Sequence, residues 1–179
     1  MSNERLHWLV GYTMPRCEKK LHSRLADMGV ESYLPLNQVI KEWSDRKKKI
    51  EVPLFPNYVF IHVNPRERWN LLQCRELVRF VAYEGRPAIM HDEEIHLIRT
   101  VLVNNITISS EAGRIPIRTG KRVVVKQGSM AGMKGIMVRE NHQQNVIIHL
   151  DALNHTIVLH LEAGSVLEDF EIQTTAGSV

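Results

Sequence analysis

Apolar and polar positions in the first hundred residues change their period several times, and each change predicts a new element. Residues 6–12 form a short apolar and aromatic run, which is typical of a strand. From Arg16 the apolar positions recur at helical spacing until Gly29, which predicts an amphipathic helix of about three turns. Thr13 is the expected N-cap of this helix, because a hydroxyl side chain there can accept a hydrogen bond from the first turn.

The rest of this part alternates between strand and helix patterns. Helices are expected from Asn64 to about Cys74, with Trp69 and Leu72 facing inward, and from Asp92 onward. Further strands are expected at residues 30–34, 39–43, 49–54, 58–63 and 77–83. This order predicts a largely antiparallel sheet with helices on one face, which makes residues 1–103 an α+β domain.

The pattern changes after residue 103. Residues 104–117 lose the periodicity and concentrate Asn, Ser, Gly and Pro, which predicts a linker. Short strand patterns separated by Gly and Asn turns then follow at residues 122–126, 135–140, 146–150, 156–161 and 166–167. They predict a small all-β barrel of five strands over residues 118–172, followed by a tail at residues 173–179.

Composition narrows the class of protein. With 179 residues, 44% hydrophobic and 24% charged, the chain suits one or two modest soluble domains. It contains neither the roughly 20 consecutive apolar residues of a membrane span nor a signal-peptide cleavage site, so we expect a cytoplasmic protein without a membrane partner. Cys17 and Cys74 lack the spacing of metal ligands and are expected to be reduced thiols.

The positive charge is concentrated near the start of the chain. Net charge is +3, and the first 60 residues hold ten Lys and Arg against seven Asp and Glu, while the remainder is balanced. Arg16, Lys20 and Arg24 repeat every four residues along one edge of the first helix, and Lys47 and Lys48 lie in a turn between two expected strands. Such residues suit contacts to phosphate groups, but a solvated surface explains them about as well.

Catalytic patterns are missing from the sequence. None of the nine histidines falls in a zinc-binding array, no serine lies in a GxSxG elbow, and no Gly-rich stretch precedes a helix. His149, His155 and His160 alternate through expected strands, where hydrogen-bonded structural histidines are the better interpretation. We therefore expect a protein that is not an enzyme and needs no cofactor.

Residues 53–63 (PLFPNYVFIHV) combine aromatic and β-branched positions. Alternate side chains of a strand point to opposite faces, so Tyr58, Phe60 and His62 share one face. This aromatic set is either a second core layer or a docking patch on the sheet face that the helices leave open, and the pattern alone does not decide between them. Tyr12, at the end of the first strand, could join it.

Several stretches resemble the NusG family of transcription factors, and specifically its specialised branches, RfaH and the UpxY-type regulators of capsular polysaccharide operons. Residues 8–12 (WLVGY) look like the opening strand of the family, and residues 55–60 (FPNYVF) are similar to its signature strand in the form found in RfaH. Residues 43–48 (WSDRKK) with 53–56 (PLFP) look like the UpxY branch, and residues 78–89 are similar to a stretch of RfaH.

The second half carries a pattern similar to the KOW motif. Its positions are Gly128, Met130, Gly132 and Gly135, in a strand-turn-strand context. The resemblance implies an SH3-like barrel of five strands. Met130 stands where many family members have an aromatic residue, so the partner of this barrel does not follow from the resemblance.

The resemblance also implies two sets of contacting residues. An aromatic and apolar patch of the first domain would bind the clamp helices of the largest RNA polymerase subunits, and the matching positions are Tyr12, Phe55, Tyr58 and Phe60. Basic residues would read the exposed non-template DNA strand. The positions that match those places in RfaH are Lys20, Arg24 and Arg75.

These implications lead to an expected function. The chain would act as a monomeric elongation and antitermination factor that suppresses pausing or termination in specific operons of the polysaccharide-biosynthesis type. Its barrel would contact a second machine through a small-subunit ribosomal protein or Rho. The alternative is an RNA- or ribosome-binding KOW protein acting in translation, in which the aromatic patch would be core.

Overall fold

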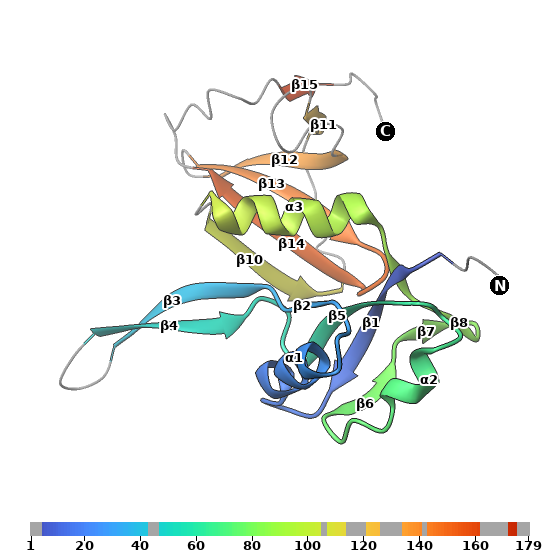
Figure 1. The fold of residues 1–179 in the computed structure, drawn as a ribbon. Coiled ribbons are helices and arrows are strands. Elements are labelled where there is room, and N and C mark those ends of the chain that lie inside the picture. The colour runs from blue at the N-terminus through green and yellow to red at the C-terminus, as the bar shows by residue number, and fades with distance from the viewer. Residues whose placement is uncertain are drawn as a thin grey trace. The chain divides into compact units, whose positions relative to one another are not determined.

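The computed structural model describes residues 5–42, 47–104, 107–113, 121–125, 134–140, 143–161 and 172–174. The chain divides into two compact units, residues 1–92 and residues 93–179. Each unit is described by itself. Figure 1 shows their helices and strands.

The first unit is built on an antiparallel sheet with β1 (His7–Thr13) at its centre. On one side β1 pairs with β5 (Tyr58–Val63), and β2 (Ser32–Tyr33) lies beyond β5. On the other side β1 pairs first with β6 (Leu77–Phe80) and then with β9 (Ile89–Met90). The antiparallel sheet that the sequence predicts in this part of the chain is therefore confirmed.

Helix α1 (Glu18–Asp27) packs on one face of this sheet (Figure 1). Its apolar positions, Leu21 and Leu25, are buried against Leu9 and Ile61, as the helical spacing predicts. Gly29 ends the helix with a φ of +71°, a conformation that favours glycine. The prediction that Thr13 is the N-cap is wrong, because Thr13 is the last residue of β1 and is buried there. Cys17 occupies the N-cap position without a side-chain hydrogen bond.

A side chain at Gly11 would have to displace the ends of two buried side chains. A Cβ atom built there would lie 2.9 Å from Cδ1 of Ile61 and 3.0 Å from Cδ1 of Leu77. Since Cβ atoms essentially never approach other heavy atoms so closely, any larger residue would displace β5 or β6 side chains. Gly11 therefore allows the side chains of β5 and β6 to pack closely against β1.

Helix α2 (Arg68–Leu71) is shorter than the predicted helix and presents a different face. Leu71 is buried in the core, whereas Trp69 is 60% exposed. The prediction that Trp69 faces inward is wrong. The four-residue helix places Leu71 rather than Trp69 over the sheet. With two leucines in succession, at residues 71 and 72, the sequence pattern did not show which side of so short a helix is buried.

Two hairpins extend from the sheet. Strands β3 (Leu36–Glu42) and β4 (Lys47–Pro53) form a separate two-stranded arm, which projects from the rest of the unit in Figure 1. Strands β7 (Ala82–Tyr83) and β8 (Arg86–Pro87) form a tight hairpin. Its two turn residues have positive φ angles, +50° at Glu84 and +77° at Gly85, as expected for a two-residue turn.

The second unit contains an antiparallel sheet in the order β10-β14-β13-β12-β11-β15. Its strands are β10 (Thr107–Ala112), β11 (Lys121–Val125), β12 (Lys134–Glu140), β13 (Gln143–Leu150), β14 (His155–Leu161) and β15 (Ile172–Thr174). Helix α3 (Asp92–Val103) begins at the boundary between the units, and its apolar positions Ile95, Ile98 and Val101 are buried.

Strand β10 corrects the expected linker at residues 104–117. It pairs with β14 residue by residue, from Thr107 opposite His160 to Ala112 opposite His155, and its Ile108 is buried. The Asn and Ser content of the segment outweighed its few apolar positions, Ile108 among them, in the sequence pattern. The prediction of a linker across residues 104–117 is therefore wrong for residues 107–112.

The barrel itself stays a prediction. Its first four strand patterns coincide with β11 to β14, and all pairs in the described sheet are antiparallel. The fifth pattern, at residues 166–167, lies outside the described residues, as do Gly128, Met130 and Gly132. Among the described helices, none combines the length and hydropathy that crossing a bilayer requires.

Candidate functional site

A cluster of aromatic side chains lies at one end of the first unit's sheet. Tyr12 and Tyr58 are opposite each other on β1 and β5, with ring centroids 5.5 Å apart and planes at 70°. Arg79, opposite Tyr12 on β6, places its guanidinium carbon 5.5 Å from the centroid of the Tyr12 ring. Together with Tyr83, which is half exposed, these residues form what we call the tyrosine cluster.

The environment of Tyr58 shows that the members of this cluster influence one another. Partial burial raises the pKa of Tyr58 above its ordinary value, and the neighbouring Tyr12 and Tyr83 raise it further, whereas Arg79 lowers it. Tyr83 and Arg79 were not singled out from the sequence. The pairing of β1 with β6 brings Arg79 to Tyr12, and this long-range register has no local sequence signal.

Phe55 and Phe60, which the resemblance placed on an exposed patch, are buried, with 1% and 0% of their surface exposed. Phe60 contacts Phe55 edge to face at a centroid distance of 5.8 Å and stacks on Tyr33 at 6.2 Å. Strand alternation correctly places Phe60 on the same face of β5 as Tyr58. On that face Tyr58 is partly exposed, whereas Phe60 is covered and belongs to the core. These two phenylalanines support the tyrosine cluster rather than belong to its surface.

The turn before Tyr58 is held by Glu18, a residue that the sequence pattern did not indicate. Asn57 has a φ of +68°, and its N–H donates a hydrogen bond of 2.8 Å to Oε1 of the buried Glu18 on α1. The carbonyl of Asn57 accepts a hydrogen bond of 2.8 Å from the N–H of Thr13. The first helix and the first strand therefore fix the position of the FPNY turn.

A second cluster surrounds the carboxylate of Glu76, immediately before β6. The Nζ atom of Lys20 lies 3.0 Å from Oε1 of Glu76, and the Nε atom of Arg24 lies 3.2 Å from Oε2. The Nη2 atom of Arg24 also donates to Oε1, at 3.2 Å. The hydrogen bond from Lys20 is the main cause that lowers the pKa of Glu76 below its ordinary value.

The structure therefore brings two of the predicted DNA-contacting residues, Lys20 and Arg24, to one carboxylate. Lys20 and Arg24 meet at Glu76, and Arg75, the residue before Glu76 in the chain, is exposed. We call Lys20, Arg24, Arg75 and Glu76 the basic cluster. Arg16 is exposed just before α1 and has a φ of +62°.

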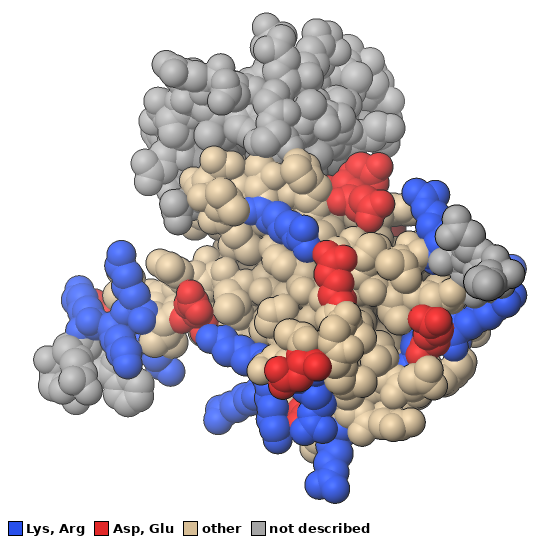
Figure 2. Space-filling model, viewed as in Figure 1, with Lys and Arg blue, Asp and Glu red and all other residues tan. Residues whose placement is uncertain are grey.

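The remaining predicted basic residues lie on the hairpin arm. Lys47 and Lys48 are exposed on β4, where Lys47 pairs with Glu42 and Lys48 lies opposite Lys41. Figure 2 shows Lys and Arg side chains gathered over α1 and along the outer part of the arm. The arm and the basic cluster are thus two separate places at which this unit presents positive charge.

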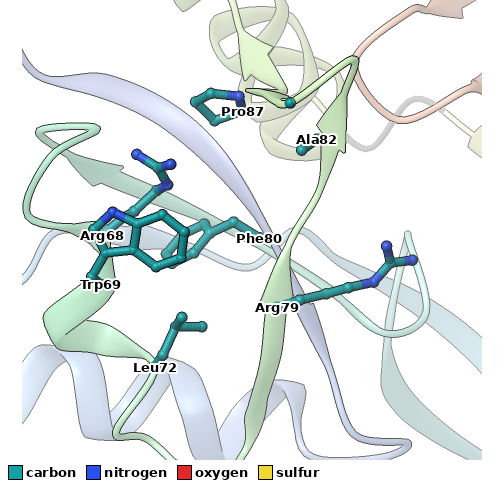
Figure 3. A pocket seen from close by; sticks show the side chains of 8 residues that line it. Arg68, Trp69, Leu72, Arg79, Phe80, Ala82 and Pro87 are labelled. Atoms are coloured by element: carbon teal, nitrogen blue, oxygen red, sulfur yellow. The ribbon is translucent and has the colours of Figure 1, made fainter.

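A shallow pocket of about 160 Å³ lies between α2 and the β6 to β8 segment. In Figure 3, Trp69 and Arg68 face the β6 residue Phe80 across it. The guanidinium carbon of Arg68 lies 4.2 Å from the centroid of the Trp69 ring, so the indole is partly covered by a cation-π contact. The described residues contain no group of three His, Cys, Asp or Glu side chains that could hold a metal ion.

The three histidines that alternate through β13 and β14, His149, His155 and His160, are hydrogen-bonded, as predicted. His160 contacts Ser109 Oγ at 3.0 Å and Asn145 Oδ1 at 3.2 Å, while His155 contacts the carbonyl of Leu153 at 2.9 Å. Nδ1 of His149 lies 3.2 Å from the hydroxyl of Thr156. Each has a partner within the fold, which fits a structural role.

Gly135 is the KOW position that the structure describes. A Cβ atom there would lie 3.0 Å from the carbonyl oxygen of Ile147 and 3.0 Å from Cγ1 of Val146. The tight approach of β12 to β13 therefore favours glycine at this position.

Comparison with known proteins gives consistent matches. Residues 6–99, more than half of the chain, match the family model described as "Transcription termination factor nusG". The transcription termination/antitermination protein NusG of Vibrio vulnificus (strain CMCP6) is 24% identical over 164 residues, which cover 84% of this chain and 87% of that protein. A solved structure of Thermotoga maritima NusG, concerned with domain interaction, superimposes with a TM-score of 0.52 at 19% identity over 89% of this chain and 94% of the other. At that identity the structural likeness shows the fold alone.

Proposed function

The chain belongs to the NusG family, whose members are transcription factors that bind RNA polymerase, and on this basis we propose which of its surfaces contacts polymerase and which contacts DNA. A role in transcription elongation or antitermination follows from the family. We propose that the tyrosine cluster docks on the clamp helices of the largest polymerase subunits. The basic cluster then contacts the non-template DNA strand.

The exposure of the tyrosine cluster is the observation that carries the docking proposal. Tyr12 and Tyr58 are partly exposed, Tyr83 is half exposed, and Arg79 lies beside them. Tyrosine and arginine are enriched among the residues that dominate binding energy at protein interfaces, because they bury a large area and still offer hydrogen-bonding groups. Phe55 and Phe60 have a supporting role in this proposal, since both are buried.

The basic cluster supports the DNA contact. Lys20 and Arg24 are held at the same carboxylate, Arg75 is exposed directly before that residue in the chain, and Arg16 is exposed just before the same helix. Lys47 and Lys48 on the arm add a second place for phosphate contacts. Contacts of this kind fix the position of the protein on the nucleic acid and weaken as the salt concentration rises.

A protein bound in this way can suppress pausing without performing any chemistry. If it binds the elongating conformation of polymerase more tightly than the paused one, it shifts the equilibrium toward elongation. A preference of about 1.4 kcal/mol corresponds to about tenfold. We further propose that the factor is a specialised family member of the RfaH or UpxY type that serves specific operons, and this rests on the resemblance of residues 43–48 and 55–60.

We propose that the second unit completes the barrel of the KOW type and links the transcribing complex to a second machine. The described antiparallel strands β11 to β14 and the tight approach at Gly135 support this proposal. A small-subunit ribosomal protein and Rho are the two candidate partners of this unit.

The test is a transcription assay with the full-length protein and its host polymerase on the leader that precedes its own operon. The proposal predicts more full-length transcript than with buffer alone, and more than the general NusG of the same host gives. Unchanged transcription together with tight binding to ribosomal subunits would contradict the proposal. That outcome would favour the RNA- or ribosome-binding alternative.

A further inference from the structure

Glu76 is the acidic member of the basic cluster, and its carboxylate is almost completely buried, with 3% of the side chain exposed. A carboxylate beside residues that contact phosphate groups opposes binding through its charge. It is therefore a residue that charge alone would not place in a DNA-contacting surface. Its contacts suggest a different contribution.

The contacts of Glu76 determine where the two cationic groups lie. Arg24 approaches side-on, with Nε 3.2 Å from Oε2 and Nη2 donating to Oε1 at 3.2 Å, while Nζ of Lys20 lies 3.0 Å from Oε1. Of these two Arg24 contacts only the one from Nη2 has hydrogen-bond geometry, and Nη1 takes no part in it. The side chains of Lys20 and Arg24 are still 70% and 42% exposed, so both can meet a ligand.

The backbone around Glu76 is itself fixed. Its carbonyl accepts a hydrogen bond of 3.0 Å from the N–H of Met14, and the next residue, Leu77, is buried and paired with Thr13 of β1. The carboxylate is therefore attached to fixed backbone directly before β6, while Lys20 and Arg24 come from α1. A rigid element thus holds two long and otherwise mobile side chains.

We propose that Glu76 is a positioning residue, which holds Lys20 and Arg24 in the arrangement in which they bind phosphate groups of single-stranded DNA. This inference rests on the proposed DNA contact of the basic cluster. Lys and Arg lose much rotamer freedom when they bind, and side chains that are ordered beforehand lose less. Glu76 therefore favours binding through order although its charge opposes binding.

For the effect of removing the Glu76 charge on DNA affinity, the positioning role and simple electrostatics predict opposite signs. Replacing Glu76 by Gln raises the net charge by one, which by charge alone would strengthen binding. Glu51 offers a matched control, because its carboxylate lies 3.8 Å from Nζ of Lys19 on the same helix and both side chains are about half exposed. Glu51→Gln adds the same charge but releases only an exposed contact, which contributes little to order.

The experiment measures the affinity of the full-length protein for a fluorescein-labelled 15-nucleotide oligo(dT) by anisotropy at low salt. Glu76→Gln is expected to weaken binding about fivefold, since the order lost at Lys20 and Arg24 outweighs the gain in positive charge. Glu51→Gln is expected to leave binding unchanged or to strengthen it by up to about twofold. Lys20→Gln should weaken binding more in the wild-type background than in the Glu76→Gln background, because the two residues act together.

Two further variants separate the possible failures. Glu76→Asp keeps the charge, and it should bind between wild type and Glu76→Gln; it also serves if thermal melting shows that Glu76→Gln does not fold. Binding by folded Glu76→Gln as tight as that of Glu51→Gln would overturn the inference and leave the DNA contact intact. Unchanged binding after Lys20→Gln with Arg24→Gln would instead contradict the proposed DNA contact itself.

Discussion

Replacing Glu18 by Ala tests whether the FPNY turn depends on the first helix. The buried carboxylate of Glu18 accepts a hydrogen bond of 2.8 Å from the N–H of Asn57, whose φ of +68° is unusual for a residue with a side chain. A hydrogen bond to a charged group contributes about 1.5–3 kcal/mol, and an acidic residue in the first helical turn adds about 0.3–1 kcal/mol. Part of this is offset, because Ala has no charge to desolvate. We expect a net loss of about 2 kcal/mol in the free energy of unfolding.

Urea denaturation followed by tryptophan fluorescence measures this loss. All three tryptophans lie in the first unit, and Trp8 is buried and stacked on His62 at a centroid distance of 4.6 Å. Glu51→Ala is the control, since its exposed ion pair should contribute at most about 1 kcal/mol. Glu18→Gln keeps an acceptor oxygen and should fall between wild type and Glu18→Ala. If Glu18→Ala is as stable as Glu51→Ala, Glu18 does not hold the turn.

Three other predictions follow from individual contacts. Gly11→Ala should lower the free energy of unfolding by about 1–3 kcal/mol in the same denaturation assay, because its Cβ would lie 2.9 Å from Ile61, and unchanged stability would contradict the packing described. Because the pKa of Glu76 is lowered in the folded protein, its ionised form stabilises the fold above the unfolded pKa, and this stabilisation is lost as pH falls through the folded pKa. The melting temperatures of wild type and Glu76→Gln should therefore converge in acid. Because the pKa of Tyr58 is raised in the folded protein, its contribution to the stability of the fold is present below the unfolded pKa and is lost as pH rises through the folded pKa. Ultraviolet titration of wild type and Tyr58→Phe should show that the tyrosine missing from the variant ionises above its ordinary pH.

The sequence predicted the elements whose signals are local. The apolar runs of β1 and β5 and the helical spacing of Leu21 and Leu25 each identify an element and its buried face. Gly29 marked the end of α1 because a left-handed residue is most easily glycine. The NusG resemblance then added the expectation of contact surfaces, which no periodicity could have supplied.

The errors have a common cause, which is that burial depends on partners distant in sequence. Phe60 lies on the predicted face but is covered, because Phe55 and Tyr33 contact it, and alternation cannot show which part of a face is covered. Strand β10 was missed because its pairing partner is distant in the sequence. β10 starts at Thr107, whereas β14 starts 48 residues later, at His155. Composition reports none of these contacts.

The acidic residues of the candidate site were missed for a related reason. A search for phosphate-binding residues looks for Lys and Arg, and Glu18 and Glu76 contribute by holding other groups in place. Both act across the junction of α1 with a neighbouring segment, so their contribution is visible only once the helix is placed against the sheet. Arg79 similarly reaches Tyr12 only through the pairing of β6 with β1.

Docking of the tyrosine cluster on RNA polymerase is tested most directly by measuring how tightly the full-length protein binds host core polymerase. Tyr58→Ala and Tyr83→Ala should each retain the melting temperature of wild type to within a few degrees, because both side chains are partly or half exposed. At least one of them should weaken binding by about 2 kcal/mol, or roughly thirtyfold, as expected for an aromatic anchor. Wild-type affinity in the folded double variant would contradict the claim and would place the polymerase contact elsewhere on the protein.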